Sequence, residues 1–165
     1  MPVKDTLDWA RFSRAIYIST TPATAYGLWA TGAGLTRWWL ARARYFSPAG
    51  EAHDKKYHAQ KGDRFEWSWY EGTVLTGHVI EANGKDHFAF TFGGKVVVHV
   101  HLKVVGDRML VELDQEGMAN NPAGQKFYIG CTTAWAAYLT NMRSVLEGGL
   151  DLREKKPDRE NLVNA

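Results

Sequence analysis

Residues 97–114 read VVHVHLKVVGDRMLVELD, in which apolar and polar side chains alternate on both sides of a Gly106-Asp107 pair. Such a pair suits a two-residue turn between antiparallel strands, so Val105 is expected opposite Arg108. On one face this register aligns apolar residues only: Val104, Leu102 and Val100 with Met109, Val111 and Leu113. On the other face it places His101 opposite Glu112 and His99 opposite Asp114. One apolar face and one charge-matched face are typical of a half-buried sheet.

Two further hairpins precede this one. Asn83-Gly84 is a favoured pair for a type I′ turn, which places Ala82 opposite Lys85. A three-residue loop with Gly72 at its end is expected between the preceding two strands. The Asn83-Gly84 turn pairs Val79, Gly77 and Leu75 with Phe88, Phe90 and Phe92. The loop from Tyr70 to Gly72 places Trp69, Trp67 and Phe65 beside Leu75 and Gly77.

The fourth turn, around Gly93-Gly94, has two interpretations. A two-residue loop would bring the phenylalanine face against Lys95, Val97 and His99. A three-residue loop of Phe92, Gly93 and Gly94 pairs Phe90 with Val96 and Phe88 with Val98. We prefer the second interpretation because it gives five consecutive strands one consistent apolar face.

The segments on either side of these hairpins complete an α+β chain. Residues 12–19 predict a strand with Ile16 and Ile18 inward, and Thr21-Pro22 begins a short helix that ends near Thr31. A second short helix around residues 35–40, a strand at 41–47 and a long polar loop at 48–62 follow. An apolar stripe at spacings of three and four predicts a long helix from Asn121-Pro122 to Gly148-Gly149. The polar residues 151–165 are expected to form a frayed tail.

Composition narrows the class of protein. The 165 residues fit one domain, with 45% apolar and 13% aromatic residues and a formal charge of +2. This charge is too small to suggest a nucleic-acid partner, and no apolar run is long enough for membrane insertion. The single Cys131 cannot form an internal disulfide, so a cytoplasmic setting is expected. The sequence leaves open whether the chain forms a homodimer.

The order of elements resembles the helix-grip fold of the START, polyketide-cyclase and birch-pollen-allergen superfamily. In that fold a curved antiparallel sheet of about seven strands wraps around a long C-terminal helix, with two short helices between the first two strands. Several segments are similar to the branch named after the activator of heat-shock-protein ATPase. They are Thr21-Pro22 with Tyr26, Leu35 to Trp39, Gly77 to Glu81, Phe88 to Phe92, Ala134 to Met142 and Leu146 to Arg153.

The resemblance implies a single helix-grip domain over residues 1–165 and a cavity between sheet and helix that binds hydrophobic molecules in some relatives. Other relatives have no assigned reaction. The eukaryotic founder of the branch stimulates a chaperone ATPase through a separate N-terminal domain that these residues lack, so a chaperone partner is not expected.

Few residues suggest chemistry. His99 and His101 share one strand face and could begin a metal site, but each has a carboxylate opposite it and no third ligand stands at a recognisable spacing, so surface ion pairing is expected. His53 and His58 lie in the polar loop and are expected to be solvated. Cys131 is expected to pack as a small apolar residue. No catalytic residue, metal or cofactor is predicted.

The remaining question is whether the aromatic residues fill the core or line a cavity. Gly77 is expected to leave a gap opposite Phe65 and Phe90, which favours a cavity. Tyr26, Tyr128 and Tyr138 offer hydroxyls that could orient an apolar ligand. The predicted ligand-binding residues are Tyr26, Trp38, Trp39, Trp67, Trp69, Phe88, Phe90, Val98, Val100, Val111, Trp135, Tyr138 and Met142.

Three functions fit this cavity. The first is non-catalytic binding of a small hydrophobic molecule, either aromatic or acyl. The second is a cyclase or aromatase that uses Tyr or His as an acid-base group. The third is a chaperone-directed interaction module, which the family name alone supports. The inward strand positions contain no His, Asp, Glu or Lys, and this favours the first.

Overall fold

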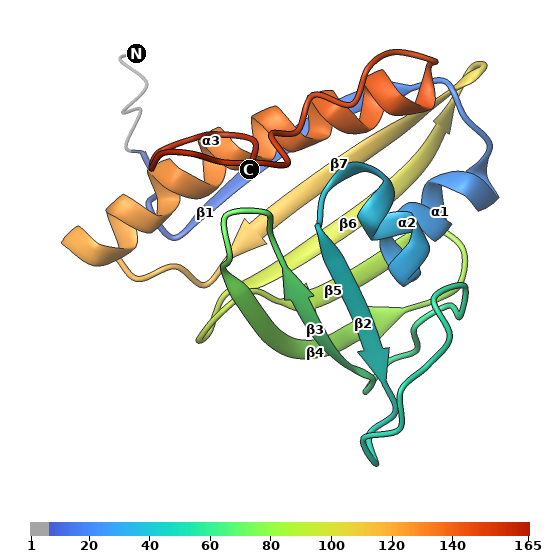
Figure 1. Cartoon of the computed structure of the whole chain (residues 1–165), viewed down its shortest axis with the longest axis horizontal. Coiled ribbons are helices and arrows are strands. Elements are labelled where there is room, and N and C mark those ends of the chain that lie inside the picture. The colour runs from blue at the N-terminus through green and yellow to red at the C-terminus, as the bar shows by residue number, and fades with distance from the viewer. Residues whose placement is uncertain (1–6) are drawn as a thin grey trace, which may run out of the picture.

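The computed structural model describes residues 7–165 as one curved sheet closed by helices (Figure 1). The seven-stranded antiparallel sheet has the order β1-β7-β6-β5-β4-β3-β2. In chain order the elements are β1 (Arg11–Ile18), α1 (Pro22–Ala30), α2 (Gly32–Trp38), β2 (Arg42–Phe46), β3 (Arg64–Ser68), β4 (Val74–Ala82), β5 (His87–Thr91), β6 (Val97–Val105), β7 (Arg108–Glu116) and α3 (Pro122–Leu146). The predicted α+β fold, with two short helices between the first two strands, is confirmed.

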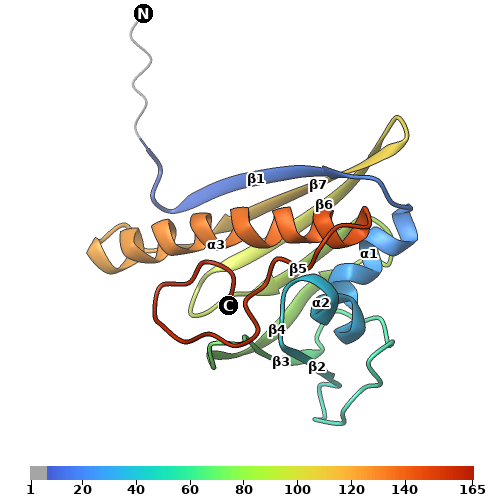
Figure 2. The ribbon, with the colours of Figure 1, turned by 45° about the horizontal axis from the view of Figure 1, so that its top comes forward.

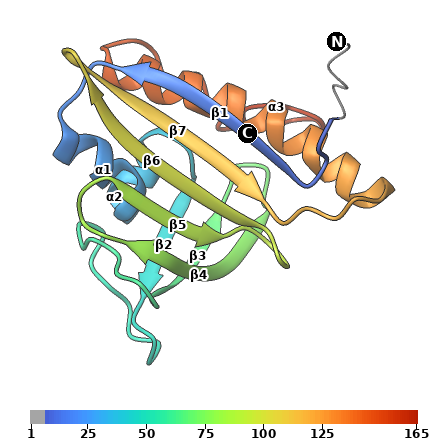
Figure 3. The same ribbon diagram turned by 180° about the vertical axis from the view of Figure 1, so that it is seen from behind.

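The layers are best seen in two views. α3 lies along the inner face of the sheet beneath β1, while α1 and α2 close one end of the same side (Figure 2). From behind, β5, β6 and β7 lie in front with no helix over them (Figure 3). The sheet therefore has one face that packs a core and one face that meets solvent.

Two predicted hairpin registers are confirmed. Val105 pairs with Arg108 across the Gly106-Asp107 turn, and His101 and His99 pair with Glu112 and Asp114. Between β3 and β4 the expected three-residue loop pairs Trp67 with Leu75 and Phe65 with Gly77. In both cases the turn chemistry and the apolar pattern agree, which leaves a single register.

The other two predicted registers are wrong. Phe90 pairs with Val98 rather than Val96, because the three-residue loop is Gly93 to Lys95: Phe92, expected in the loop, instead donates its amide to the Val96 carbonyl at 2.8 Å. Gly93 and Gly94 take positive φ in this loop (87° and 54°). Val79 pairs with Phe90 rather than Phe88, after a bulge between Val79 and Glu81.

The turn between β4 and β5 explains the second error. The side-chain Oδ1 of Asn83 accepts hydrogen bonds from the amides of Lys85, Asp86 and His87, which holds a wider turn than a type I′ pair. The β5–β6 register and the Val79–Phe90 pair differ from the prediction by two residues, and a shift of two leaves a side chain on its predicted face. Between the bulge and the turn the shift is three, since Ala82 pairs with Phe88 rather than Lys85. The predicted apolar face is therefore preserved despite the wrong pairs.

Side-chain caps set the helix ends. The Thr31 hydroxyl donates to the Gly27 carbonyl at 2.7 Å and accepts from the Gly34 amide at 2.9 Å, so it ends α1 and begins α2. α2 consequently starts at Gly32, earlier than expected. At the start of α3, Asn121 Oδ1 accepts from the Gly124 amide at 2.8 Å. The 25-residue helix ends before Gly148, whose φ is 81°.

Aromatic rings fill the space between the sheet and α3. Trp29, Trp38 and Trp67 are 0% exposed. The expected gap at Gly77 does not exist, because a Cβ there would collide with the Phe65 ring and the Thr91 hydroxyl. Glycine is needed at this position so that the Phe65 ring can lie across the neighbouring strand.

The predicted frayed tail is also wrong. Residues 151–165 fold back beside α3 (Figures 1 and 2). The Arg153 guanidinium donates to the carbonyl oxygens of Thr36, Leu40 and Arg37 at 3.0, 3.0 and 3.1 Å, and to Asp151 Oδ2 at 2.7 Å. A helix leaves its last carbonyls without intrahelical donors, so this buried side chain caps the end of α2. In the sequence Arg153 suggests a solvated tail, but in the structure this side chain anchors the tail to α2.

None of the helices in residues 7–165 combines the length and the apolar character that a membrane crossing requires.

Candidate functional site

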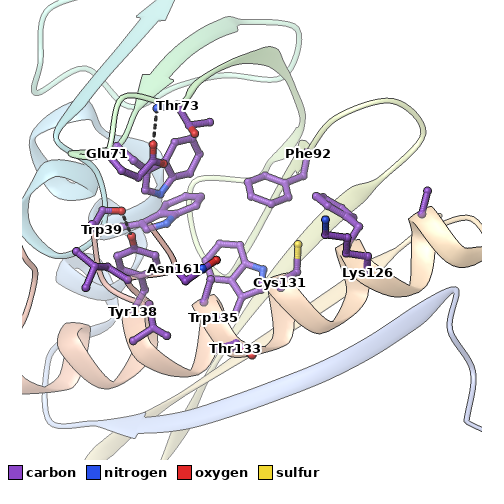
Figure 4. A pocket seen from close by; sticks show the side chains of 18 residues that line it. Trp39, Glu71, Thr73, Phe92, Lys126, Cys131, Thr133, Trp135, Tyr138 and Asn161 are labelled. Atoms are coloured by element: carbon purple, nitrogen blue, oxygen red, sulfur yellow. Dashed lines mark hydrogen bonds between the residues drawn. The ribbon is translucent and has the colours of Figure 1, made fainter. Parts of the chain in front are cut away.

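An open pocket of about 770 Å³ lies between α3, the sheet and the C-terminal tail (Figure 4). Its residues come from parts of the chain that are far apart in sequence, which only the tertiary fold brings together. They are Trp39, Trp69, Glu71, Thr73, Phe92, Ala123, Lys126, Phe127, Gly130, Cys131, Thr133, Ala134, Trp135, Tyr138, Asn161, Leu162, Val163 and Ala165.

The inner wall of the pocket is a cluster of aromatic rings. Trp39 follows α2 and lies at its centre, with ring centroids 4.7 Å from Trp135 on α3 and 5.5 Å from Trp69. Phe92, next to β5, lies 5.7 Å from Trp135. Trp39 and Trp135 are 2% exposed, whereas Trp69 and Phe92 are half-buried, so the latter two offer the larger apolar surface to a guest.

One of these rings is held in place from behind. The Trp135 indole nitrogen donates to Gln115 Oε1 at 2.8 Å, and Gln115 Nε2 donates to the Met118 sulfur at 3.4 Å. Gln115 is 0% exposed and its polar atoms are satisfied. These hydrogen bonds therefore fix the Trp135 ring independently of any ligand.

The tail forms the outer wall. The Tyr138 hydroxyl donates to a main-chain oxygen of Ala165 at 2.7 Å. Leu162 and Val163 contribute apolar side chains to the pocket lining. Burial raises the pKa of the Tyr138 hydroxyl to about 12, so this group stays protonated at neutral pH.

Cys131 is the other reactive group that the pocket contains. Its thiol is buried, and burial raises the pKa of the thiol, which disfavours the nucleophilic thiolate. The expectation that Cys131 packs as an apolar residue agrees with its place in the core cluster.

Polar groups occur at the pocket rim. Glu71 and Lys126 line the pocket from the β3–β4 loop and from α3 (Figure 4). Glu71 Oε2 is engaged locally, because it accepts a hydrogen bond from the Thr73 amide at 2.7 Å. A charged rim around an apolar interior would orient an amphipathic guest with its polar end outward.

A second hollow of about 530 Å³ adjoins the first and shares Trp69, Thr73, Phe92 and Phe127 with it. Its other walls include Leu75, Val96 and Met118 at the far end of the sheet. Phe127 is 40% exposed at the border between the two hollows. The apolar surface available to a guest thus extends along α3.

The predicted ligand-binding residues divide into two groups. Trp39, Trp69, Trp135 and Tyr138 line the pocket. Tyr26, Trp38, Trp67, Phe88, Phe90, Val98, Val100, Val111 and Met142 are buried in the core behind it. Side chains therefore fill most of the predicted cavity, and the open pocket lies closer to the C-terminal tail. Whether any of these residues contacts a ligand stays a prediction.

The other two predicted hydroxyls lie away from this pocket. Tyr26 accepts a hydrogen bond from the Gly84 amide at 2.9 Å. Tyr128 packs edge-on against Trp9 and Phe12, with ring centroids 5.1 and 5.2 Å apart. Of the three, only Tyr138 lies in the pocket.

Sequence reasoning missed Phe92 and the tail as walls of the site. Phe92 was assigned to a loop because the Gly93-Gly94 register was wrong. The Leu162-Val163 pair was the one available signal in the tail, since adjacent apolar residues in a polar segment often mark a contact with the core.

The loop histidines differ in their surroundings. His58 is exposed and its ring stacks on Tyr26, with centroids 6.3 Å apart. His53 is not solvated as expected: its side chain is 20% exposed, its ring stacks on Tyr57, and Nε2 lies 3.5 Å from Asp63 Oδ1. The buried Asp63 carboxylate draws this ring inward. Neither histidine lines the pocket.

Comparisons with known proteins agree with this fold. A family model described as "Activator of Hsp90 ATPase homolog 1-like protein" matches residues 19–147. No curated protein matches the chain.

Solved structures resemble the whole domain. The solution structure of an Aha1 dimer from Colwellia psychrerythraea is 17% identical, with a TM-score of 0.68, and the match covers 84% of this chain and 97% of that one. Protein SSP2350 from Staphylococcus saprophyticus is 13% identical, with a TM-score of 0.67 and coverage of 87% and 96%. DynU16, described as a putative protein in the dynemicin biosynthetic locus, is 12% identical, with a TM-score of 0.64, and covers 88% of this chain and 50% of its own. At these identities the likeness shows the fold.

Proposed function

The chain belongs to the Activator of Hsp90 ATPase homolog 1-like family, and on that basis we propose that it binds a small hydrophobic molecule, aromatic or acyl, in the pocket beside α3 without converting it. The observation that carries the proposal is an open pocket of about 770 Å³ whose inner wall is a cluster of aromatic rings. Ligand sites typically measure about 300–1,000 Å³ and are lined mainly by apolar and aromatic side chains with a few polar groups.

The walls suggest the shape of the guest. The rings of Trp39, Trp69 and Trp135 meet at angles that offer contacts to a flat ring system or to a bent acyl chain. A guest of this kind would displace water from the pocket. It would not have to supply a hydrogen-bond partner for Trp135, because the Trp135 indole nitrogen already donates to Gln115. The charged rim favours a molecule with a polar group at the end that remains near solvent.

A second feature lies directly behind Trp39. The Trp67 ring is 5.3 Å from the Trp39 ring, and its buried indole N–H has no hydrogen-bond acceptor among residues 7–165. Buried donors without partners are uncommon. A guest that turned Trp39 aside would find there a donor for a carbonyl or carboxylate oxygen.

The acid-base chemistry of the pocket favours binding over catalysis. A cyclase or aromatase is the alternative that the superfamily resemblance raises, and the likeness to DynU16, a putative protein of a biosynthetic locus, extends to the fold alone. General acid-base catalysis works best with a pKa near the operating pH. The pKa of Tyr138 is about 12 and that of the Cys131 thiol is raised, so neither group is poised for proton transfer at neutral pH.

The test compares two alanines of α3. Ala134 lines the pocket and Ala136 is exposed elsewhere on the same helix, so Leu at each position adds the same side chain to one helix. Decanoate and the fluorescent 1-aminoanthracene serve as probes, with binding followed by fluorescence and by the shift in melting temperature. We expect wild type and Ala136→Leu to bind alike and Ala134→Leu to bind at least about tenfold more weakly, a loss of about 1.4 kcal/mol.

Equal affinity of all three proteins, or no binding to wild type, would contradict the proposed pocket. Mass spectrometry of the probes after incubation separates the alternatives. Recovery of unchanged probe supports a binding protein, and a converted probe that depends on Tyr138 supports an enzyme. Stimulation of a chaperone ATPase by the purified chain would instead favour an interaction module.

A further inference from the structure

Three histidines on β5 and β6 have ring nitrogens close to one another. Their side chains alternate with the buried residues Phe88, Val98 and Val100, so they lie on the opposite face of the sheet from the core. No helix within residues 7–165 covers β5 and β6 on this side (Figure 3). His87 lies on β5 and pairs directly with His101 on β6, and His99 lies two residues before His101. His87 Nε2 is 3.1 Å from His99 Nδ1. One nitrogen from each of the three rings can be chosen so that all lie within 4.8 Å of one another.

The third histidine corrects an expectation from the sequence. Along the sequence, no third ligand stands at a recognisable spacing from His99 and His101. Strand pairing between β5 and β6 brings His87 to them across the loop, at a separation that no motif encodes. The register that places it there is the one that the Gly93-Gly94 pattern left ambiguous.

The spacing of these nitrogens suits a metal ion. Zinc binds imidazole nitrogen at about 2.0–2.1 Å, which makes the edge of a tetrahedral site about 3.3 Å long. The His87–His99 separation of 3.1 Å is close to such an edge. The rings now stack, with the His87 and His101 centroids 4.5 Å apart, so binding would need rotation of the His101 ring toward the other two.

The surrounding groups support a cation. His99 Nε2 lies 3.5 Å from Glu116 Oε1 while its Nδ1 faces His87. A carboxylate on the far nitrogen is the common way in which proteins orient a metal-binding histidine and raise its basicity. Glu112 lies opposite His101, and Glu81 on β4 is held nearby by Lys61 at 2.8 Å. Asp114, opposite His99, accepts a hydrogen bond from Ser13.

We propose that His87, His99 and His101 form a binding site for a divalent transition-metal ion of intermediate softness, such as Zn²⁺, Ni²⁺ or Cu²⁺. Imidazole is a preferred ligand for these ions, whereas Mg²⁺ and Ca²⁺ favour oxygen. Glu116 orients His99 and is not a ligand. Three protein ligands leave at least one coordination position for water or for a small anionic ligand. The site lies on the opposite face of the sheet from the apolar pocket, so the two can be tested independently.

The experiment is calorimetric titration of the untagged chain with Zn²⁺, joined to the visible spectrum of the Co²⁺ form. The absorption bands of Co²⁺ report the coordination number. We expect one bound ion per chain and a spectrum typical of four or five ligands. Substitution of any one of the three histidines by Gln should weaken binding by at least about tenfold, and Glu116→Gln by about 10–100-fold, the range seen when outer partners of metal ligands are changed.

His78→Gln is the matched control, because His78 is exposed on neighbouring β4 and lies outside the cluster. It should bind Zn²⁺ as wild type does. Circular dichroism and the melting temperature of each metal-free variant confirm that it folds. Binding that survives in His87→Gln, His99→Gln and His101→Gln, or that falls equally in His78→Gln, would overturn the site. So would a wild-type chain that binds no ion.

Discussion

Replacement of Arg153 by Met tests whether the C-terminal tail is part of the folded domain. The change keeps an unbranched apolar side chain and removes the guanidinium, whose donors reach three main-chain carbonyls at the end of α2 and the carboxylate of Asp151. The Arg153 side chain is 3% exposed and that of Asp151 is 26% exposed. The carbonyls would therefore lose their donors in a buried place, while the carboxylate would be partly rehydrated.

The magnitude follows from these burials. Removing one partner of a buried ion pair costs about 3–5 kcal/mol, because the other partner is left without compensation. Partial exposure of Asp151 places this case near the lower end, so we expect a loss of about 3 kcal/mol in the free energy of unfolding. For a domain of this size 1 kcal/mol corresponds to about 2–4 °C, so the melting temperature should fall by about 6–12 °C.

Thermal and urea unfolding followed by circular dichroism measure this change, with Arg159→Met as the control. Arg159 is exposed in the same tail, so its replacement should shift the melting temperature by less than about 2 °C. Limited proteolysis supplies a second readout, since a released tail would be cleaved within residues 154–165 while the rest of the domain resisted cleavage. A melting temperature for Arg153→Met within the range of the control would refute the anchoring role of the guanidinium.

Four other outcomes are expected. Asn141→Ala removes a buried side-chain amide that donates to the Trp38 carbonyl at 2.8 Å and accepts from the Leu152 amide at 2.7 Å, so the free energy of unfolding measured by urea titration should fall by about 2–3 kcal/mol. Gly77→Ala forces a methyl group against the Phe65 ring and should cost about 1–3 kcal/mol in the same assay; a wild-type midpoint would mean that the ring moves freely. Gly130→Ala, where an added Cβ meets nothing within 4 Å, should raise stability by about 0.5–1 kcal/mol through a better helix propensity. Hydrogen bonds from its guanidinium partner hold the pKa of Asp151 well below its ordinary 3.8, so its stabilisation is complete above that unfolded-state value and is lost as the pH falls toward the folded-state value. An acid titration of Asp151→Asn should lack this component of the pH dependence.

How far the sequence leads can be judged from individual residues. The β6–β7 hairpin was predictable to the residue, because Gly106-Asp107 permits a tight turn and only one register puts Val100, Leu102 and Val104 against apolar partners. The Gly93-Gly94 turn was not, since two adjacent glycines permit several loops and the apolar pattern repeats every two residues. Side-chain faces were therefore predictable where the strand pairs themselves were not.

The candidate site was predictable in part. The rings of Trp39, Trp69 and Trp135 were expected to share one room, and they line the pocket. The alternation of apolar residues places these rings on one face, but it could not show that the core rings behind them fill most of the expected cavity. Volume depends on how side chains interlock, and a pattern of apolar residues carries no information about that fit.

By itself the sequence determined the order of elements, the apolar face of the sheet and the amphipathic helix that covers it, because local periodicity and turn chemistry encode these features. Tertiary structure alone decided which distant residues meet. It folded the tail back through Arg153, since a guanidinium can satisfy carbonyls at the end of a helix more than 100 residues earlier in the chain. It also joined His87 to His99 and His101, because hydrogen bonds between strands, and not spacing along the chain, set that contact.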